Sequence, residues 1–185
     1  MLKVTELDLR VSRRRSVEAN HVNPIWISGQ IDGNLFVNFT GRFSEIMNGT
    51  KSGDQITVFI NSLGGETQTA LGIFDLLNTS DRHVVGIVAG TAQSGASMIL
   101  QGCSERLMTE NSTLMLHKST VQLGGSVLNV EETLKTFKSY DEQYYKIYAS
   151  RSGDKVKNIS DMAHMDKYFT AAQALESGLI DKIIK

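Results

Sequence analysis

Two segments of the sequence place small residues where a strand would run directly into a helix. Residues 60–66 contain Gly64 and Gly65, and residues 90–97 contain Ser94 followed by Gly95. A serine that opens a helix lies near the positive end of the helix dipole, and the amides of the first turn have no partner inside the helix. Such amides can stabilise a developing oxyanion, so Ser94 is a candidate nucleophile. Taken alone, Ser94 also fits a simple N-cap, and the glycine pair fits an ordinary turn.

A serine nucleophile needs a base, and His117 is the best placed of the four histidines. It directly follows the apolar run 114–116, and α/β domains usually present functional groups where strands end. The other three, His21, His83 and His164, fall in polar segments, which is typical of surface histidines. By itself a histidine at a strand end is more often structural, but of the four it is His117 that the sequence favours as a general base.

A carboxylate must orient the base, and spacing alone leaves Asp161, Asp166 and Asp181 open. Cys103 is the only cysteine, so no intrachain disulfide can form, and its place late in an apolar helix predicts a core position. No histidine pair has helical metal-ligand spacing, and no Walker A loop or dinucleotide fingerprint occurs. We therefore expect neither a metal nor a cofactor.

The elements that must position these residues alternate as strands and helices from about residue 25 to the end. The 185 residues are 41% hydrophobic and 21% charged, which excludes a disordered chain and predicts one α/β domain with short buried strands. The net charge of −1 favours neither nucleic acid nor an anionic membrane. Without a signal-peptide pattern or an apolar run of about 20 residues, we expect a cytoplasmic protein.

The predicted caps mark where several helices begin and end. Asn34 is a candidate N-cap for a helix over 35–47, and Asn129 is a candidate N-cap for the long helix that Gly153 ends. Thr170 with Gln173 has capping-box spacing for the last helix. The strands are expected at 25–27, 56–60, 84–88, 113–117 and 179–184.

Four ordered motifs resemble the ClpP family, the proteolytic subunits of Clp proteases. They are residues 59–65, 90–97, 111–117 and 166–174, the last followed by 178–181. The resemblance runs from about Trp26 to Ile184 and implies an α/β, ClpP/crotonase-like fold with stacked βαβ units and a protruding handle helix at about 122–150. It divides the chain into an N-terminal arm or axial loop, residues 1–20, and a single peptidase domain, residues 21–185.

The site residues follow from matching positions in those motifs. The resemblance implies a serine endopeptidase in which Ser94 is the nucleophile, His117 the general base and Asp166 the orienting carboxylate. It also implies that the amides of Gly65 and Gly95 form the oxyanion hole.

A second set of residues is implied for substrate binding. Leu123, Gly124 and Gly125 resemble part of a glycine-rich strand beside the active site, where an extended substrate could pair as an added strand. The handle helix carries Tyr140, Tyr144, Tyr145 and Tyr148, more tyrosines than one face of a lone helix should expose.

The implied function is an ATP-independent peptidase core that hydrolyses unfolded polypeptides inside an oligomeric chamber. The chamber would be a homo-oligomer of two stacked seven-membered rings, a tetradecamer, fed by an AAA+ unfoldase. Two alternatives stay open: a phage-type head-maturation protease on the same fold, and a non-catalytic ring subunit of a hetero-oligomeric complex. The resemblance implies no cofactor, nucleic acid or membrane partner.

The sequence departs from the family pattern at four positions. Leu63 replaces a proline beside the proposed oxyanion hole, and Gly95 replaces a methionine. Met165 stands where many members carry an arginine that pairs between rings, just before the proposed carboxylate. Thr57 replaces one of two aromatics that line the partner-docking cleft, whereas Phe59 keeps the other. These departures are typical of a divergent relative, such as one encoded by a phage or plasmid.

Overall fold

The computed structural model describes residues 24–164 and 166–185. The predicted N-terminal arm at 1–20, His21 and Met165 lie outside the described residues, so the predictions for them stay predictions.

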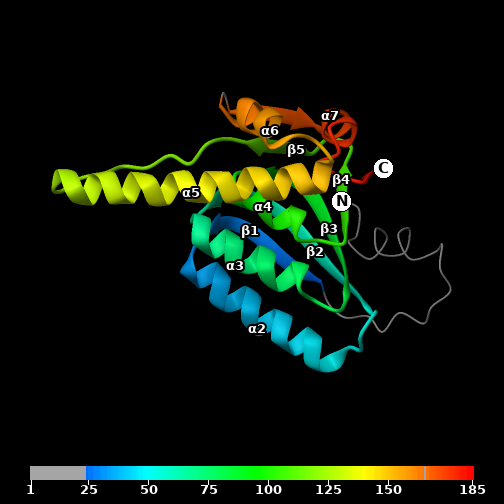
Figure 1. Cartoon of the computed structure of the whole chain (residues 1–185). Helices are drawn as coiled ribbons and strands as arrows, with labels where there is room; N and C mark the ends of the chain where they lie inside the picture. Colours follow the sequence, from blue (N-terminus) through cyan, green and yellow to red (C-terminus); the bar gives the residue numbers. More distant parts are fainter. Residues whose placement is uncertain (1–23, 165) are drawn as a thin grey trace.

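Strands and helices mostly alternate along the described chain, apart from one pair of consecutive strands and one pair of consecutive helices (Figure 1). The strands are β1 (Ile25–Ile31), β2 (Gln55–Gly65), β3 (His83–Gln93), β4 (Glu105–Thr109), β5 (Thr113–Leu116), β6 (Lys167–Thr170) and β7 (Lys182–Ile184). The helices are α2 (Gly33–Gly49), α3 (Thr67–Asn78), α4 (Gly95–Gln101), α5 (Val127–Ser152), α6 (Val156–Ala163) and α7 (Ala171–Glu176).

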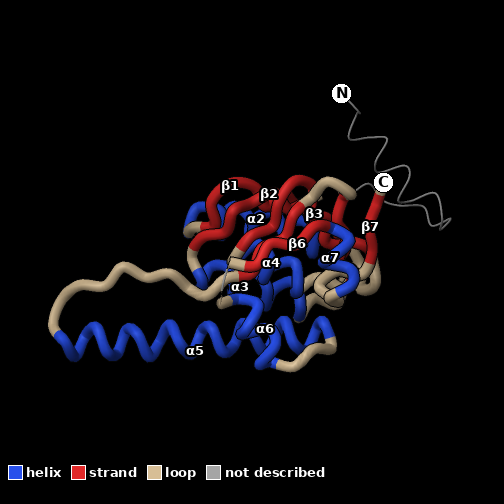
Figure 2. The backbone as a smooth tube through the Cα atoms, turned by 90° about the horizontal axis from the view of Figure 1, so that it is seen from above, coloured by secondary structure: helices blue, strands red, loops and turns tan. Residues whose placement is uncertain are grey.

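The strands form one mostly parallel sheet in the order β1-β2-β3-β4-β7. β5 pairs in parallel with the end of β3, and β6 pairs antiparallel with β5. The helices gather on one face of this sheet (Figure 2). The predicted α/β class is thus confirmed, and the parallel order brings the carboxyl ends of β2 and β3 to the same edge.

Alternate residues of the central strands enter two different apolar clusters. Val58 and Ile60 of β2 lie in the main core with the helices, whereas Phe59 between them joins a second cluster with Val85 and Leu107. This period of two is the geometry of an extended strand, whose successive side chains point to opposite faces of the sheet.

The predicted boundaries were wrong at two helix starts. α2 is capped by Asp32, whose side chain accepts from the Leu35 amide, and not by Asn34. α5 is capped by Ser126 and not by Asn129, which lies inside the helix. Two other predicted caps are confirmed: Gly153 ends α5 in a left-handed conformation, and a capping box at Thr170 with Gln173 starts α7.

Strand lengths also differ from prediction. β2 and β3 are both 11 residues long and continue beyond the predicted strand ends at 60 and 88, through the small residues that follow. β1 likewise runs on to Ile31, whereas β7 is shorter than expected and covers only Lys182–Ile184. Glycine-containing segments remain extended here because neighbouring parallel strands pair with them.

Helix α5 is the longest element and projects beyond the body of the molecule (Figures 1 and 2). Residues 117–126 carry the chain out to its tip, where Val127 and Leu128 are each 74% exposed. The predicted handle, about 122–150, overlaps this projection, although its helix begins only at Val127. None of the described helices combines the length and the apolar character needed to cross a membrane.

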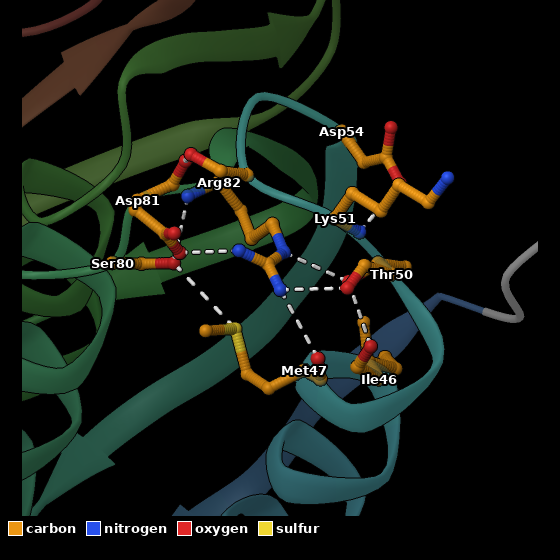
Figure 3. A network of polar contacts seen from close by, with 9 residues as sticks. Ile46, Met47, Thr50, Lys51, Asp54, Ser80, Asp81 and Arg82 are labelled. Atoms are coloured by element: carbon orange, nitrogen blue, oxygen red, sulfur yellow. Dashed lines mark hydrogen bonds and ion pairs between the residues drawn. The ribbon is translucent and has the colours of Figure 1, made fainter.

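A polar network around Arg82 joins the two loops at the amino ends of β2 and β3 (Figure 3). The Arg82 guanidinium donates to the carbonyls of Met47 and Thr50, at 3.1 and 2.7 Å, and to the Thr50 hydroxyl at 2.9 Å. It also pairs with the neighbouring Asp81. This end of the sheet is therefore fastened by polar contacts, and the opposite end carries the glycines and Ser94.

A second network fastens the C-terminal segment to the sheet. The buried Arg106 guanidinium, 4% exposed, binds both Asp181 oxygens at 2.6 and 3.0 Å and donates to Gln101 at 2.7 Å. Burial alone would raise the pKa of the Asp181 carboxyl, but the hydrogen bonds and charge of Arg106 outweigh burial and lower that pKa. The pair therefore stabilises the fold through an ionised carboxylate.

Asp181→Asn is expected to lower the free energy of unfolding by about 3 kcal/mol near neutral pH, because Arg106 would keep a buried charge without its partner. Since the folded pKa of Asp181 is lowered, this contribution is full above the unfolded pKa of about 4 and is lost as pH falls through the folded value. Urea unfolding at fixed protein concentration, near pH 7 and near pH 3, measures both effects.

The matched control is Glu45→Gln, which neutralises the carboxylate of the exposed pair with Arg42. We expect it to change the free energy of unfolding by at most about 1 kcal/mol. A loss for Asp181→Asn as small as the control, or one that stays the same at both pH values, would contradict this reading of the network.

Candidate active site

Ser94 occupies a sharp turn between β3 and α4. Its backbone angles are φ 51° and ψ −124°, and only one other non-glycine residue in the described part of the chain, Asp166, has a positive φ. Left-handed conformations of non-glycine residues are strained and gather at functional sites. Although Ser94 holds the N-cap position, its side chain makes no capping hydrogen bond, so the hydroxyl is available for another partner.

That partner is His117, whose Nε2 lies 2.7 Å from Ser94 Oγ. The pairing of β3 with β5, which sets Gln93 against Met115, brings the turn after β3 beside the residue that follows β5. The Ser94 amide donates to the Met115 carbonyl at 3.0 Å, which fixes the two segments together. The predicted nucleophile and base therefore meet within hydrogen-bond distance.

The backbone after His117 is held on both sides. The Lys118 amide donates to the Ala163 carbonyl at 3.0 Å. The Ser119 amide and hydroxyl both donate to one oxygen of Asp141 on α5, at 3.0 and 2.7 Å. Sequence reasoning missed Asp141, because nothing in its local pattern links it to a residue 22 positions earlier.

Asp166 is the candidate carboxylate that lies nearest to the imidazole. β6 runs antiparallel to β5 with Lys167 opposite Leu116, so the preceding Asp166 faces the position of His117. Asp166 Oδ1 lies 3.7 Å from His117 Nδ1, which is longer than a hydrogen bond, and the aspartate side chain is 69% exposed. Of the other open candidates, Asp181 is engaged by Arg106.

The glycine segment at the end of β2 approaches the Ser94 turn closely. A Cβ on Gly64 would lie 2.8 Å from the Ser94 Cβ and 3.1 Å from the Gly95 amide nitrogen. A Cβ on Gly65 would lie 2.1 Å from the Ile31 carbonyl oxygen, so β1 leaves no room for a side chain there. The two predicted junctions therefore meet through backbone, and this contact requires glycine in the first of them.

Gly95 lies at the same contact between the end of β2 and the Ser94 turn. A Cβ on it would be 3.8 Å from the Gly65 amide nitrogen and 2.9 Å from the Ala70 Cβ on α3. Gly95 therefore lies close to the Gly65 amide nitrogen, and the oxyanion hole formed by their two amides stays a prediction. The close Ala70 also accounts for the small residue at position 95, because a longer side chain would need α3 to move.

The segment containing Leu123, Gly124 and Gly125 does not form a strand within this chain. It runs as an extended loop toward the tip of α5 (Figure 1), with both glycines exposed. The sequence expectation of a strand was therefore wrong for the single chain, because a strand needs a hydrogen-bonded neighbour and no segment of the described chain supplies one. Its role in substrate binding stays a prediction.

A small apolar pocket lies directly beside Ser94 and His117. Its other lining residues come from β5, α5 and α6: Leu116, Tyr144, Tyr145, Tyr148, Ile159 and Ala163. The three tyrosines are buried, which agrees with the expectation that a lone helix face would not expose so many tyrosines. The sequence spacing places these tyrosines on one helix face, and that face turns toward the body of the molecule.

Cys103 is buried in the main core, as predicted. Burial raises the pKa of its thiol to about 12, so the reactive thiolate is not populated near neutral pH. Within residues 24–164 and 166–185, no three His, Cys, Asp or Glu side chains lie close enough together to hold a metal ion.

Comparison with known proteins finds a family model that matches nearly the whole chain. The family model described as "Clp protease" matches residues 22–185. The chain is 26% identical over 161 residues to the ATP-dependent Clp protease proteolytic subunit 2 of Tropheryma whipplei, covering 86% of this chain and 89% of that protein.

Two further relatives are more similar over shorter alignments. The chain is 30% identical over 132 residues to the ATP-dependent Clp protease proteolytic subunit 1 of Bacillus cereus, which covers 70% of this chain and 68% of that protein. It is also 30% identical over 135 residues to the proteolytic subunit of Porphyromonas gingivalis, covering 72% of this chain and 61% of that protein.

Proposed function

Because this chain belongs to the Clp protease family, we propose that it is a serine endopeptidase whose nucleophile is Ser94. The observation that carries the proposal is the 2.7 Å contact between Ser94 Oγ and His117 Nε2. A hydroxyl at this distance can pass its proton to a neutral imidazole as it attacks a carbonyl carbon.

The reaction proceeds through an acyl-enzyme. Ser94 Oγ bonds to the carbonyl carbon of the scissile peptide while His117 Nε2 takes the hydroxyl proton. The same proton then goes to the leaving amine as the C–N bond breaks. Water enters, gives a proton to His117, and its oxygen attacks the ester, which releases the acid product and restores Ser94.

Two further groups stabilise charge along this path. The amides of Gly65 and Gly95 donate to the oxyanion of each tetrahedral intermediate. Asp166 accepts from His117 Nδ1 and stabilises the imidazolium, which requires the present 3.7 Å separation to shorten in the working complex. Assembly or substrate binding would supply that shortening, because the aspartate is on the surface of the single chain.

Substrate would lie as an extended strand beside residues Leu123, Gly124 and Gly125. In the single chain this segment is an extended loop with its two glycines exposed, so its main-chain groups can pair with another chain. The apolar pocket beside Ser94 is too small to accept a side chain of the substrate. Binding through main-chain groups would therefore favour unfolded polypeptides of varied sequence.

The working form would be a cytoplasmic homo-oligomer of two stacked seven-membered rings, fed by an AAA+ unfoldase. The exposed apolar residues Val127 and Leu128 at the projecting end of α5 are suited to contact another copy. On the sheet face away from the helices, Trp26 stacks on Phe59 with ring centroids 4.5 Å apart. This aromatic pair would form part of the unfoldase contact, in place of the aromatic missing at Thr57.

The test is peptide and protein cleavage by the purified chain, with and without an AAA+ partner. We expect cleavage of short fluorogenic peptides by the chain alone and cleavage of a folded protein only with the partner and ATP. Cleavage of folded substrate without a partner would support a head-maturation protease instead. No peptide cleavage by the assembled protein would indicate a non-catalytic ring subunit and overturn the proposal.

A further inference from the structure

A buried serine lies one helical turn after Ser94 and contacts both halves of the candidate site. Ser97 is 0% exposed, and its Oγ lies 2.7 Å from the Ser94 carbonyl oxygen and 3.0 Å from the Met115 carbonyl oxygen. The Tyr148 hydroxyl on α5, from a residue that is 3% exposed, lies 2.6 Å from the same Oγ. None of these contacts belongs to the reaction path described above.

The donors in this cluster can be assigned from its composition. A carbonyl oxygen only accepts, and Ser97 has a single hydroxyl proton. If that proton pointed at Tyr148, two carbonyl oxygens would face Ser97 Oγ with no proton between them. Tyr148 therefore donates to Ser97 Oγ, and Ser97 donates to the carbonyls, chiefly to the nearer one of Ser94.

Burial supports this direction of donation. Removal from water raises the pKa of Tyr148, so its phenol keeps its proton and stays a donor wherever the enzyme would work. The cluster thus forms a chain of hydrogen bonds, Tyr148 O–H to Ser97 Oγ–H to the Ser94 carbonyl. Successive bonds of this kind polarise one another in a water-free site.

The carbonyl at the end of this chain belongs to the strained residue. Ser94 has φ 51°, a conformation that persists only where its surroundings hold it. Its amide is held by the Met115 carbonyl, and its own carbonyl is held by Ser97. Met115 lies two residues before His117, so the same cluster fixes the nucleophile turn and the strand that carries the base.

We propose that Ser97 and Tyr148 are positioning residues that hold Ser94 Oγ in line with His117 Nε2. This inference rests on the proposed function, because it assigns these residues a part in the same reaction. They do not touch substrate with their hydroxyls. Their effect is on the geometry of attack, where a misplacement of a fraction of an ångström lowers the rate without weakening substrate binding.

The test compares Tyr148→Phe and Ser97→Ala with the wild type. Each removes one hydroxyl and keeps the rest of the packing, so both variants should fold and assemble. We expect each to lower kcat, and the rate of labelling by a fluorophosphonate, by roughly tenfold at an unchanged KM. Because both act through one chain of hydrogen bonds, the double variant should be no slower than the slower single variant.

The matched control is Tyr140→Phe, which removes a phenol hydroxyl from the same helix. That hydroxyl accepts from Gln68 on α3 and has no contact with the Ser94 turn. Its labelling rate should stay within about twofold of the wild type. Melting temperature and oligomer size, measured for every variant, separate a change of geometry from a loss of folded protein.

The outcomes distinguish this inference from the proposed function. An active wild type with unchanged kcat and labelling rate in both Tyr148→Phe and Ser97→Ala would overturn the positioning role alone, even if their melting temperatures fell. An equal loss in Tyr140→Phe would overturn it as well, because the effect would then come from α5 packing in general. A wild type that neither cleaves peptides nor takes the label would overturn the proposed function and this inference with it.

Discussion

Peptide hydrolysis is expected to fall by on the order of 10⁶-fold when Ser94 is replaced by alanine, because no other group in the site can form the acyl-enzyme. The hydroxyl is the only atom lost, and it makes no capping hydrogen bond to the helix. Ser94→Ala should therefore fold and assemble as the wild type does. Fluorogenic peptide cleavage, with size-exclusion chromatography of the same samples, measures both properties.

The control for this prediction is Ser119→Ala, which also removes one hydroxyl from a segment next to the site. Ser119 Oγ donates to Asp141 and not to the imidazole. Its loss should cost far less activity than the loss of Ser94. Activity of Ser94→Ala within tenfold of the wild type would rule out Ser94 as the nucleophile.

Asp166→Asn is expected to lower kcat by about 10⁴-fold with little change in KM, because an amide can neither fix the required tautomer of His117 nor stabilise its protonated form. In the single chain, the 3.7 Å between Asp166 Oδ1 and His117 Nδ1 is too long for a hydrogen bond. We therefore expect this hydrogen bond to form on assembly. Steady-state kinetics on the assembled protein measure the changes in kcat and KM.

Asp161→Asn is the matched control, since it makes the same chemical change in α6, on another aspartate that the sequence left open. We expect its kcat to stay within about threefold of the wild type. The assignment fails if Asp166→Asn is equally active, or if the two variants lose activity to the same extent.

The serine and the histidine could be predicted because each sits at the end of an apolar strand, and parallel strands bring their carboxyl ends together. The choice of Asp166 could not be made from spacing. It depends on the antiparallel pairing of β6 with β5, a long-range contact that places Lys167 opposite Leu116. Only the resemblance to a family selected this residue in advance.

Other features of the site lay beyond local sequence patterns. The contact between Ser97 and Tyr148 joins residues 51 positions apart, and a serine inside an apolar helix gives no sign of such a partner. The glycine segment at Gly124 and Gly125 was expected as a strand, but a strand forms only where a neighbour completes its hydrogen bonds. The cap of α2 was misplaced by two positions because Asp32 and Asn34 are both good capping residues.

Covalent labelling of the wild-type protein tests the central claim most directly. The assembled chain is treated with a fluorophosphonate, digested, and mapped by tandem mass spectrometry to find the modified residue. We predict one adduct per chain, on Ser94, and none on the buried Ser97 three residues later. A preparation that cleaves peptides but carries its adduct on another serine, or carries none, would contradict the account.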